Sequence, residues 1–131
     1  MLVKCKNNEG WGNISRGFSL VTLKEEMIAA LQETRRGEGI TESKYYDFHC
    51  SGYENGMNGV AFALDKSLRG SFKIFINKKY PDRIIIFKCE QCTVINIYHP
   101  TNEYSEEDKD NFQSEMKAVL KAARKDYRSY C

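Results

Sequence analysis

The chain has 131 residues and a formal net charge of +2, from 20 Lys and Arg against 18 Asp and Glu, which fits one small globular domain. Its composition is 41% hydrophobic and 12% aromatic, so it can bury a core, and disorder throughout is excluded. The uninterrupted apolar runs, such as residues 27–31 and 84–87, are far shorter than the roughly 20 residues that span a bilayer. We expect no membrane segment, and the lack of an apolar leader predicts an intracellular protein with reduced cysteines.

The first part of the chain changes character near residue 18. Residues 1–17 carry Asn, Gly and charges without a sustained period, which predicts an irregular segment followed by one domain over residues 18–131. Thr22 and Glu25 have capping-box spacing, and apolar residues recur at helical spacing up to Leu31. Local rules therefore predict a helix in this region.

Residues 37–44 predict a loop, and two strands should follow it at residues 45–50 and 59–64, which are rich in aromatic and β-branched residues. Ser51 to Asn58 should form the turn between these strands. The pattern is typical of antiparallel strands joined by a short connection.

The second part of the chain predicts three further strands and a helix. A strand is expected at residues 71–76, and residues 83–88 and 93–98 should form an antiparallel hairpin with Glu90 and Gln91 at its tip. Ser105 starts a capping pattern. The apolar residues that follow at helical spacing predict one long helix; they are Phe112, Met116, Val119, Leu120 and Ala123.

The cysteines and histidines form no recognisable catalytic or zinc motif. Cys89 and Cys92 make a single C-x-x-C, whereas a structural zinc site needs four ligands, so we favour a structural role over metal or redox chemistry. His49 and His99 lack a nucleophile context, and an ordinary structural role is favoured for both.

Five segments stand out by their order and spacing: Leu31-Gln32-Glu33-Thr34-Arg35, residues 46–52, Asn58-Gly59-Val60-Ala61-Phe62, Asp82-Arg83-Ile84 and Asn96-Ile97-Tyr98-His99-Pro100-Thr101. Taken together they resemble the endonuclease/exonuclease/phosphatase superfamily, which includes the apurinic endonucleases. Within it, they look like retrotransposon-derived endonucleases and craniofacial development protein 2-like proteins. The similarity covers residues 28–112, the first half of such a domain.

The resemblance implies a site. In the family, the Gln-Glu-Thr glutamate binds Mg²⁺, which assigns Glu33 as metal ligand, since Mg²⁺ takes one or two carboxylates beside substrate phosphate. The Tyr-x-Pro tyrosine is catalytic, which assigns Tyr98. Arg35 and Thr101 are expected to contact phosphate. Asn13, in a segment faintly similar to the family's first strand, is expected to do the same. In the alternative interpretation these residues have no catalytic role: Tyr98 packs at a strand end, and Glu33 is a solvated acid.

The resemblance also implies a truncated fold. The family completes its catalytic site with a Gly-Asp-Phe-Asn-like and a Ser-Asp-His-like segment, and the 131 residues contain neither. We expect an α/β fold, a partial four-layer α/β sandwich reduced to one mostly antiparallel sheet over residues 28–99 with flanking helices. The family makes residues 29–32 a strand, which shortens the expected helix to residues 23–27. One apolar face of the sheet and an unpaired edge should stay exposed, so we expect self-association through that face or that edge.

The expected function is that of a truncated, ancestrally Mg²⁺-dependent DNA phosphodiesterase that is inactive alone. The alternative is a non-catalytic remnant or domesticated module that binds a protein partner or nucleic acid. Residues 69–88 carry six basic residues against one acid, with Phe72, Phe75 and Tyr80 interleaved as candidate base-stacking groups, although a solvated strand face is the simpler interpretation. The protein should be nuclear if it acts on DNA and cytoplasmic otherwise.

Overall fold

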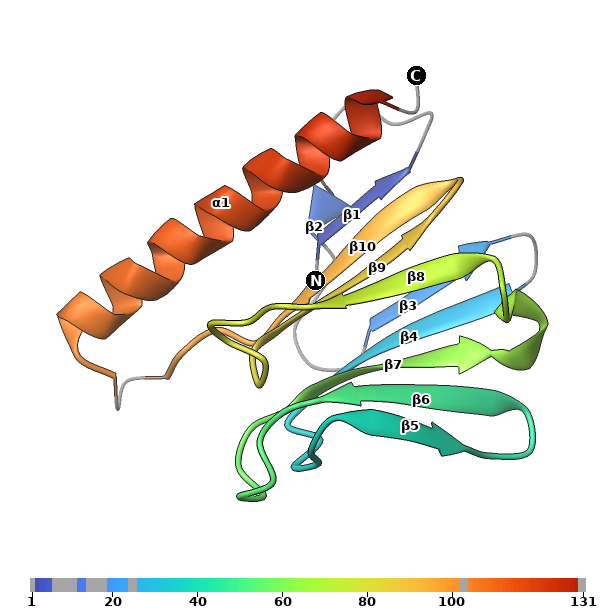
Figure 1. Ribbon diagram of the computed structural model, residues 1–131, viewed down its shortest axis with the longest axis horizontal. Helices are drawn as coiled ribbons and strands as arrows, with labels where there is room; N and C mark the ends of the chain where they lie inside the picture. The colour runs from blue at the N-terminus through green and yellow to red at the C-terminus, as the bar shows by residue number, and fades with distance from the viewer. Residues whose placement is uncertain (1, 6–11, 14–18, 24–25, 102–103, 130–131) are drawn as a thin grey trace. The chain divides into compact units, whose positions relative to one another are not determined.

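The computed structural model describes the backbone of residues 2–5, 12–13, 19–23, 26–101 and 104–129, and within these ranges the side chains from residue 28 to residue 123. The chain forms two compact units, residues 1–98 and residues 99–131. The first unit contains the strands and the second contains the helix (Figure 1). Each unit is described by itself.

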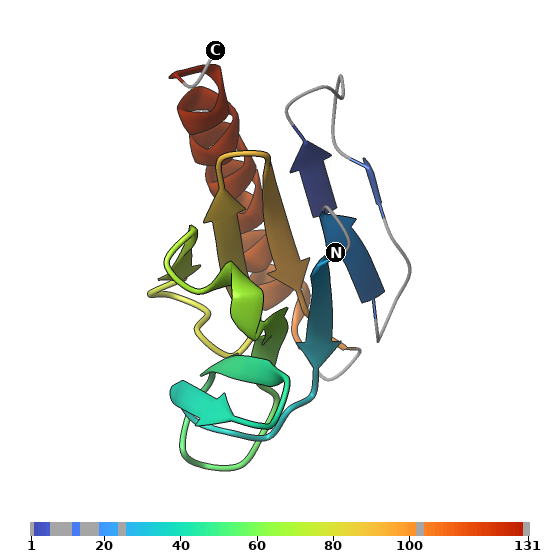
Figure 2. The ribbon, with the colours of Figure 1, turned by 90° about the vertical axis from the view of Figure 1, so that its right-hand side faces the viewer.

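The described part of the first unit consists of two antiparallel sheets of five strands each and a short 3-10 helix, η1 (Lys66–Leu68). Sheet A has the order β2 (Gly12–Asn13), β1 (Leu2–Cys5), β10 (Cys92–Ile97), β9 (Ile84–Cys89) and β8 (Phe72–Ile76). Sheet B has the order β3 (Ser19–Leu23), β4 (Glu26–Gln32), β7 (Val60–Asp65), β6 (Tyr46–Ser51) and β5 (Gly39–Glu42). The β5–β6 hairpin, turquoise to green in Figure 2, forms one edge of sheet B.

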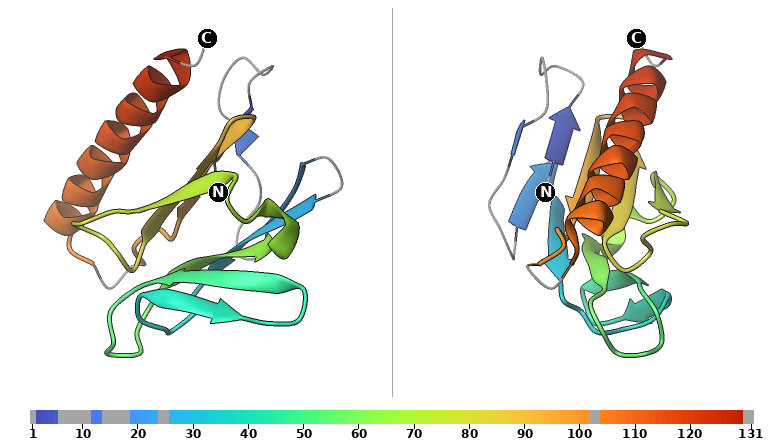
Figure 3. Two further views of the ribbon diagram at one scale, coloured as in Figure 1. Left: turned by 45° about the vertical axis from the view of Figure 1, so that its right-hand side comes forward. Right: turned by 90° about the vertical axis from the view of Figure 1, so that its left-hand side faces the viewer.

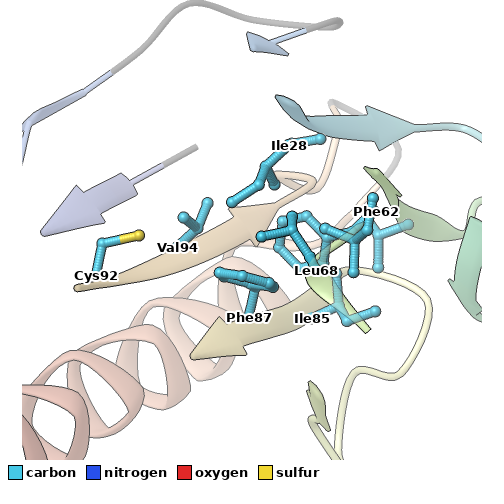
Figure 4. Close-up of a cluster of buried hydrophobic side chains, with 10 residues drawn as sticks. Ile28, Phe62, Leu68, Ile85, Phe87, Cys92 and Val94 are labelled. Carbon is cyan, nitrogen blue, oxygen red and sulfur yellow. The ribbon is translucent and has the colours of Figure 1, made fainter. Parts of the chain in front are cut away.

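The hydrophobic core lies between these two sheets. Every second residue of β7, including Phe62, is buried in one cluster with Ile28 of β4 and with Phe87 and Val94 of sheet A (Figure 4). The rings of Phe62 and Phe87 lie 6.0 Å apart, across the gap between the sheets. The expectation of a single sheet with an exposed face is therefore wrong, because a second sheet covers that face. Self-association through an unpaired sheet edge stays a prediction.

The region expected to begin with a helix is a strand hairpin instead. β3 pairs with β4, with Leu23 opposite Glu26, and β4 pairs along its length with β7. The predicted helix over residues 23–27 is wrong, whereas the strand at residues 29–32 is confirmed; Glu25 of the expected capping box lies outside the described residues. Because β4 is an interior strand that pairs with β3 on one side and with β7 on the other, pairing on both sides outweighs a local helical preference.

The other strands follow the sequence pattern closely. β6, β7, β8, β9 and β10 lie where strands were expected, and the β9–β10 pairing confirms the hairpin with Glu90 and Gln91 at its tip. Two differences are found. Residues 39–42, within an expected loop, form β5, and the N-terminal segment expected to be irregular contains β1 and β2.

In the second unit, α1 (Glu106–Ser129) begins where its cap predicts. The Oγ of Ser105 accepts a hydrogen bond from the backbone N–H of Asp108 at 3.1 Å, and three acids occupy the first turn, where they complement the helix dipole. Phe112 and Val119, members of the predicted apolar stripe, are buried. None of the helical residues that the structure describes forms a helix long and apolar enough to cross a membrane.

Candidate functional site

Glu33 and Tyr98, 65 residues apart in the sequence, meet at one end of the sandwich. Glu33 follows the last residue of β4 in sheet B, and Tyr98 follows the last residue of β10 in sheet A. The phenol Oη of Tyr98 donates a hydrogen bond to Oε1 of Glu33. The structure thus joins the two residues to which the sequence assigned metal binding and catalysis.

Two amide side chains, one fully buried and one half-buried, hold these strand ends together. Asn96 of β10, fully buried, donates from Nδ2 to the carbonyl oxygens of Leu31, at 2.8 Å, and Ala61, at 3.0 Å. Gln32 donates from Nε2 to the carbonyl oxygen of Ile97 at 2.6 Å. Gln32 directly precedes Glu33, and Asn96 lies on the strand that ends just before Tyr98. The bonds that these two amides make between the sheets therefore fix the spacing of the strands that carry Glu33 and Tyr98.

The loop that carries Glu33 is locked to two neighbouring loops. Backbone N–H groups of Thr34 and Arg35 donate to the carbonyls of Gly59, at 3.2 Å, and Asn58, at 2.7 Å, and the N–H of Gly59 donates to the carbonyl of Asp82 at 3.0 Å. These contacts hold an uncommon backbone, since Glu33, Arg35 and Asn58 all have positive φ, of 54°, 55° and 54°. Strained non-glycine residues of this kind cluster at functional sites.

Two arginines place positive charge beside the Glu33–Tyr98 pair. The guanidinium of buried Arg83 lies 4.9 Å from the centre of the Tyr98 ring and donates from Nη1 to the Tyr98 carbonyl oxygen at 3.1 Å. Arg35 is exposed. The pKa of Tyr98 is raised, first by its hydrogen bond to Glu33, then by burial and by the negative charge of Glu33, while Arg83 and Arg35 oppose the rise. The phenol therefore remains a proton donor at neutral pH.

The exposed carboxylate of Glu33 suits a Mg²⁺ ion only in company with other oxygens. Its Oε1 accepts the hydrogen bond from the Tyr98 hydroxyl, so Glu33 has one further carboxylate oxygen, Oε2, to offer to an ion. Across the described residues there is no group of three or more His, Cys, Asp or Glu side chains that could hold a metal ion. One carboxylate fits Mg²⁺ when waters and substrate phosphate supply the remaining ligands, and it does not fit a metal cage made of protein alone.

The other residues assigned to phosphate contact are not joined to this pair by the structure. Thr101 is exposed and belongs to the second unit, where its carbonyl accepts from the N–H of Tyr104 at 3.1 Å. Asn13 lies in β2 at the edge of sheet A, level with Leu2 of β1 and two strands from β10. The side chain of Asn13 lies outside the described ones.

Both histidines have structural surroundings. His49 lies against Phe72 with ring centres 5.3 Å apart, and burial lowers its pKa. His99 lies 6.0 Å from the ring of Phe112 in the second unit. Phe72 also stacks on Phe87 in the core, so it is no base-stacking platform, whereas Phe75 on β8 is 47% exposed.

Sequence reasoning missed the supporting roles of three residues. The family-like segments contain Gln32, Arg83 and Asn96, but the resemblance assigns none of them a role in the site. Their position directly before or close to motif residues was the available signal, but a bond between two sheets leaves no local pattern.

Comparison of the chain with protein-family models, with curated proteins and with solved structures found no significant match. The function is therefore argued from the geometry of the site and from the residues that form it.

Proposed function

We propose that the chain carries the metal- and phosphate-facing part of a Mg²⁺-dependent DNA phosphodiesterase site of the endonuclease/exonuclease/phosphatase type. The observation that supports this proposal is the hydrogen bond from Tyr98 to Glu33. It joins an acid that can hold Mg²⁺ to a protonated phenol that can donate to a phosphate oxygen. The two residues come from different sheets, so strand pairing does not account for their meeting.

The charges around the pair suit the same substrate class. A Mg²⁺ ion on Glu33 would add positive charge beside exposed Arg35 and buried Arg83, and a phosphodiester is the common biological anion that combines with both a divalent cation and guanidinium groups. In this arrangement Mg²⁺ supplies charge neutralisation at the phosphate. Glu33 would hold the ion, and Tyr98 would turn its single O–H from Glu33 to a phosphate oxygen, while Arg83 positions the Tyr98 ring.

We propose further that these 131 residues by themselves bind DNA but do not cleave it. Attack on phosphorus needs a group that takes the proton from water, and the sequence contains neither of the family segments that supply it. The finer fold assignment belongs to the same proposal. The two facing sheets correspond to the inner two layers of a four-layer α/β sandwich.

Binding of a short fluorescent DNA duplex, measured by anisotropy with and without Mg²⁺, tests the proposal. We expect Mg²⁺ to tighten binding, and Glu33→Gln to remove this increment while retaining the affinity measured without Mg²⁺. Glu38→Gln is the matched control, because Glu38 is an exposed acid in the same loop. Tyr98→Phe should reduce the increment, since it removes only the phenol donor.

Nicking of supercoiled plasmid, with EDTA and Glu33→Gln as controls, tests the absence of turnover. A Mg²⁺-dependent increment that persists in Glu33→Gln would refute the metal site. Nicking that disappears in Glu33→Gln would keep the site but refute the claim that these residues do not turn over DNA. Equal background nicking in both proteins is the expected result.

A second candidate function, nucleic-acid binding without a metal, rests on the edge strand β8. Phe75 is 47% exposed on this strand, and Lys73, two residues away on the same face, is exposed as well. An exposed aromatic ring beside a cation is a common single-strand binding arrangement. Binding of single-stranded DNA that is insensitive to EDTA and to Glu33→Gln, but is weakened by Phe75→Ala, would favour this candidate.

A further inference from the structure

Cys89 and Cys92 face each other across the tip of the β9–β10 hairpin, drawn in yellow to gold in Figure 3. Their Sγ atoms lie 3.8 Å apart. The register that pairs Thr93 with Lys88 places the two cysteines opposite each other one step nearer the tip. Paired residues of antiparallel strands have Cα atoms about 4.5 to 5.5 Å apart, which lies within the range that a disulfide bridges.

The two thiols differ in exposure. Cys92 is fully buried in the cluster between the sheets, beside Val94 (Figure 4). Cys89 is half-buried. A reagent in solution therefore reaches Cys89 first, while Cys92 is protected from solvent but remains within reach of the Cys89 sulfur.

The same contact activates the accessible thiol. The hydrogen bond from the Cys92 thiol is the main cause that lowers the pKa of Cys89 to about 6, and the backbone N–H groups of Cys92 and Gln91 act in the same direction against burial and the charge of Glu90. By contrast, burial raises the pKa of the Cys50 thiol. The thiolate is the reactive form of cysteine, so the pair contains a nucleophile and a neighbouring thiol that stabilises it.

We propose that Cys89 and Cys92 form a reversible dithiol–disulfide site that reacts with glutathione disulfide, with Cys89 as the attacking thiol and Cys92 as the resolving thiol. The Cys89 thiolate attacks one sulfur of glutathione disulfide, which forms a mixed disulfide and releases one glutathione thiolate. Cys92 then loses its proton and attacks the Cys89 sulfur, which releases the second glutathione. In total the two thiols are oxidised to one disulfide and one glutathione disulfide is reduced to two glutathiones.

This site is independent of the proposed phosphodiester function, because it lies at the hairpin tip and Tyr98 follows the opposite end of β10. It also differs from a zinc site. In the described part of the chain no group of three or more His, Cys, Asp or Glu side chains is placed to hold a metal ion, whereas a disulfide needs the two sulfurs alone.

The experiment equilibrates the reduced full chain in buffers of graded glutathione to glutathione disulfide ratio, blocks free thiols with N-ethylmaleimide at acid pH, and maps the products by mass spectrometry. Tryptic cleavage after Lys88 and Lys109 gives one peptide that contains Cys89, Cys92 and no other cysteine. We expect this peptide to lose two hydrogens and to carry no maleimide as the buffer becomes oxidising.

Three variants assign the roles. Cys92→Ala should stop the reaction at a glutathione adduct on Cys89, with complete loss of the internal disulfide. Cys89→Ala should leave Cys92 unmodified at the same ratios. Cys5 lies opposite Cys92 in the pairing of β1 with β10, so Cys5→Ser is the control, and the midpoint of Cys89–Cys92 oxidation should be unchanged in it. Circular dichroism of each variant verifies that it is folded.

Several outcomes would overturn the proposal. One is that both cysteines of the wild-type chain remain maleimide-labelled at every ratio. A second is a glutathione adduct on Cys89 that persists while Cys92 is present, since Cys92 would then not resolve it. A third is loss of the disulfide in Cys5→Ser, because the partner would then be Cys5.

Discussion

Replacing Asn96 by Asp should make the stability of the protein strongly dependent on pH. The Nδ2 of Asn96 donates to the carbonyl oxygens of both Leu31 and Ala61 in a fully buried position. Aspartate has nearly the same shape but, when charged, only accepts hydrogen bonds, so it would place three oxygens together without a proton between them. The protonated acid can still donate one hydrogen bond.

The expected magnitude follows from these two states. At low pH the variant loses one hydrogen bond, which costs about 1 kcal/mol of unfolding free energy. Burial beside two carbonyl oxygens should raise the pKa of the new carboxyl by about 3 units in the folded protein. Each unit corresponds to about 1.4 kcal/mol of unfolding free energy, which is lost as the pH rises from the unfolded pKa to the folded pKa. Stability is therefore retained below the unfolded pKa of about 3.9 and lost as pH rises, to a total deficit of about 5 kcal/mol near pH 7.

Urea unfolding followed by circular dichroism between about pH 3 and pH 7 measures this deficit against the wild type. Asn55→Asp is the matched control, because the exposed Asn55 side chain accepts from the N–H of Met57 through Oδ1 at 3.0 Å, a bond that aspartate retains. The control should stay within about 0.5 kcal/mol of the wild type. A deficit for Asn96→Asp that is the same at both ends of the pH range would refute the buried donor role of Asn96.

Two further predictions concern a glycine and an ion pair. Gly59→Ala should destabilise the protein by about 3 kcal/mol, from positive φ and from overpacking, because φ is +101° and a Cβ would collide with Thr34 Oγ1. Gly56→Ala is the control: φ is +75° and a Cβ would have no neighbour within 4 Å, so urea unfolding should show a loss of only about 1 kcal/mol. Equal losses of stability in the two variants would contradict the collision. The guanidinium of Arg69, bonded to Asp47 at 2.6 and 2.7 Å, lowers the pKa of that carboxyl chiefly through these hydrogen bonds. The pair therefore stabilises above the unfolded pKa of Asp47 and this contribution fades as pH falls, so Asp47→Asn should lower the melting temperature more at neutral than at acid pH; a difference that is independent of pH would contradict the assignment.

The sequence predicted the local elements from residue 46 onward well. The strands β6 to β10 and the helix after Ser105 each have a signal contained within a few residues, namely alternating or β-branched apolar residues and a capping serine. Such signals are independent of distant parts of the chain, because strand and helix periods are properties of the local backbone. The hairpin tip at Glu90 and Gln91 is of the same kind.

The sequence misjudged elements whose state depends on distant partners. Residues 26–32 carry helical spacing, but residues 28–32 pair with the distant strand β7 and residues 26–30 pair with β3, and hydrogen bonding on both edges outweighs the local preference. The second sheet was missed for a related reason. The strands divide into two sheets, β3 to β7 in one and β1, β2 and β8 to β10 in the other, whose apolar faces pack against each other. No single segment of the sequence encodes this division.

The sequence by itself determined which residue types are available for chemistry. These are an acid that follows one strand, Glu33, a tyrosine that follows another strand in a Tyr-x-Pro motif, Tyr98, and the C-x-x-C at a hairpin tip. Only the tertiary structure decided that Tyr98 donates to Glu33, that Arg83 lies over the Tyr98 ring, and that one thiol of the cysteine pair is buried. The physical reason is that hydrogen bonds and charge interactions act over a few ångströms. Whether residues 65 positions apart come that close is fixed by sheet packing, to which many side chains contribute at once.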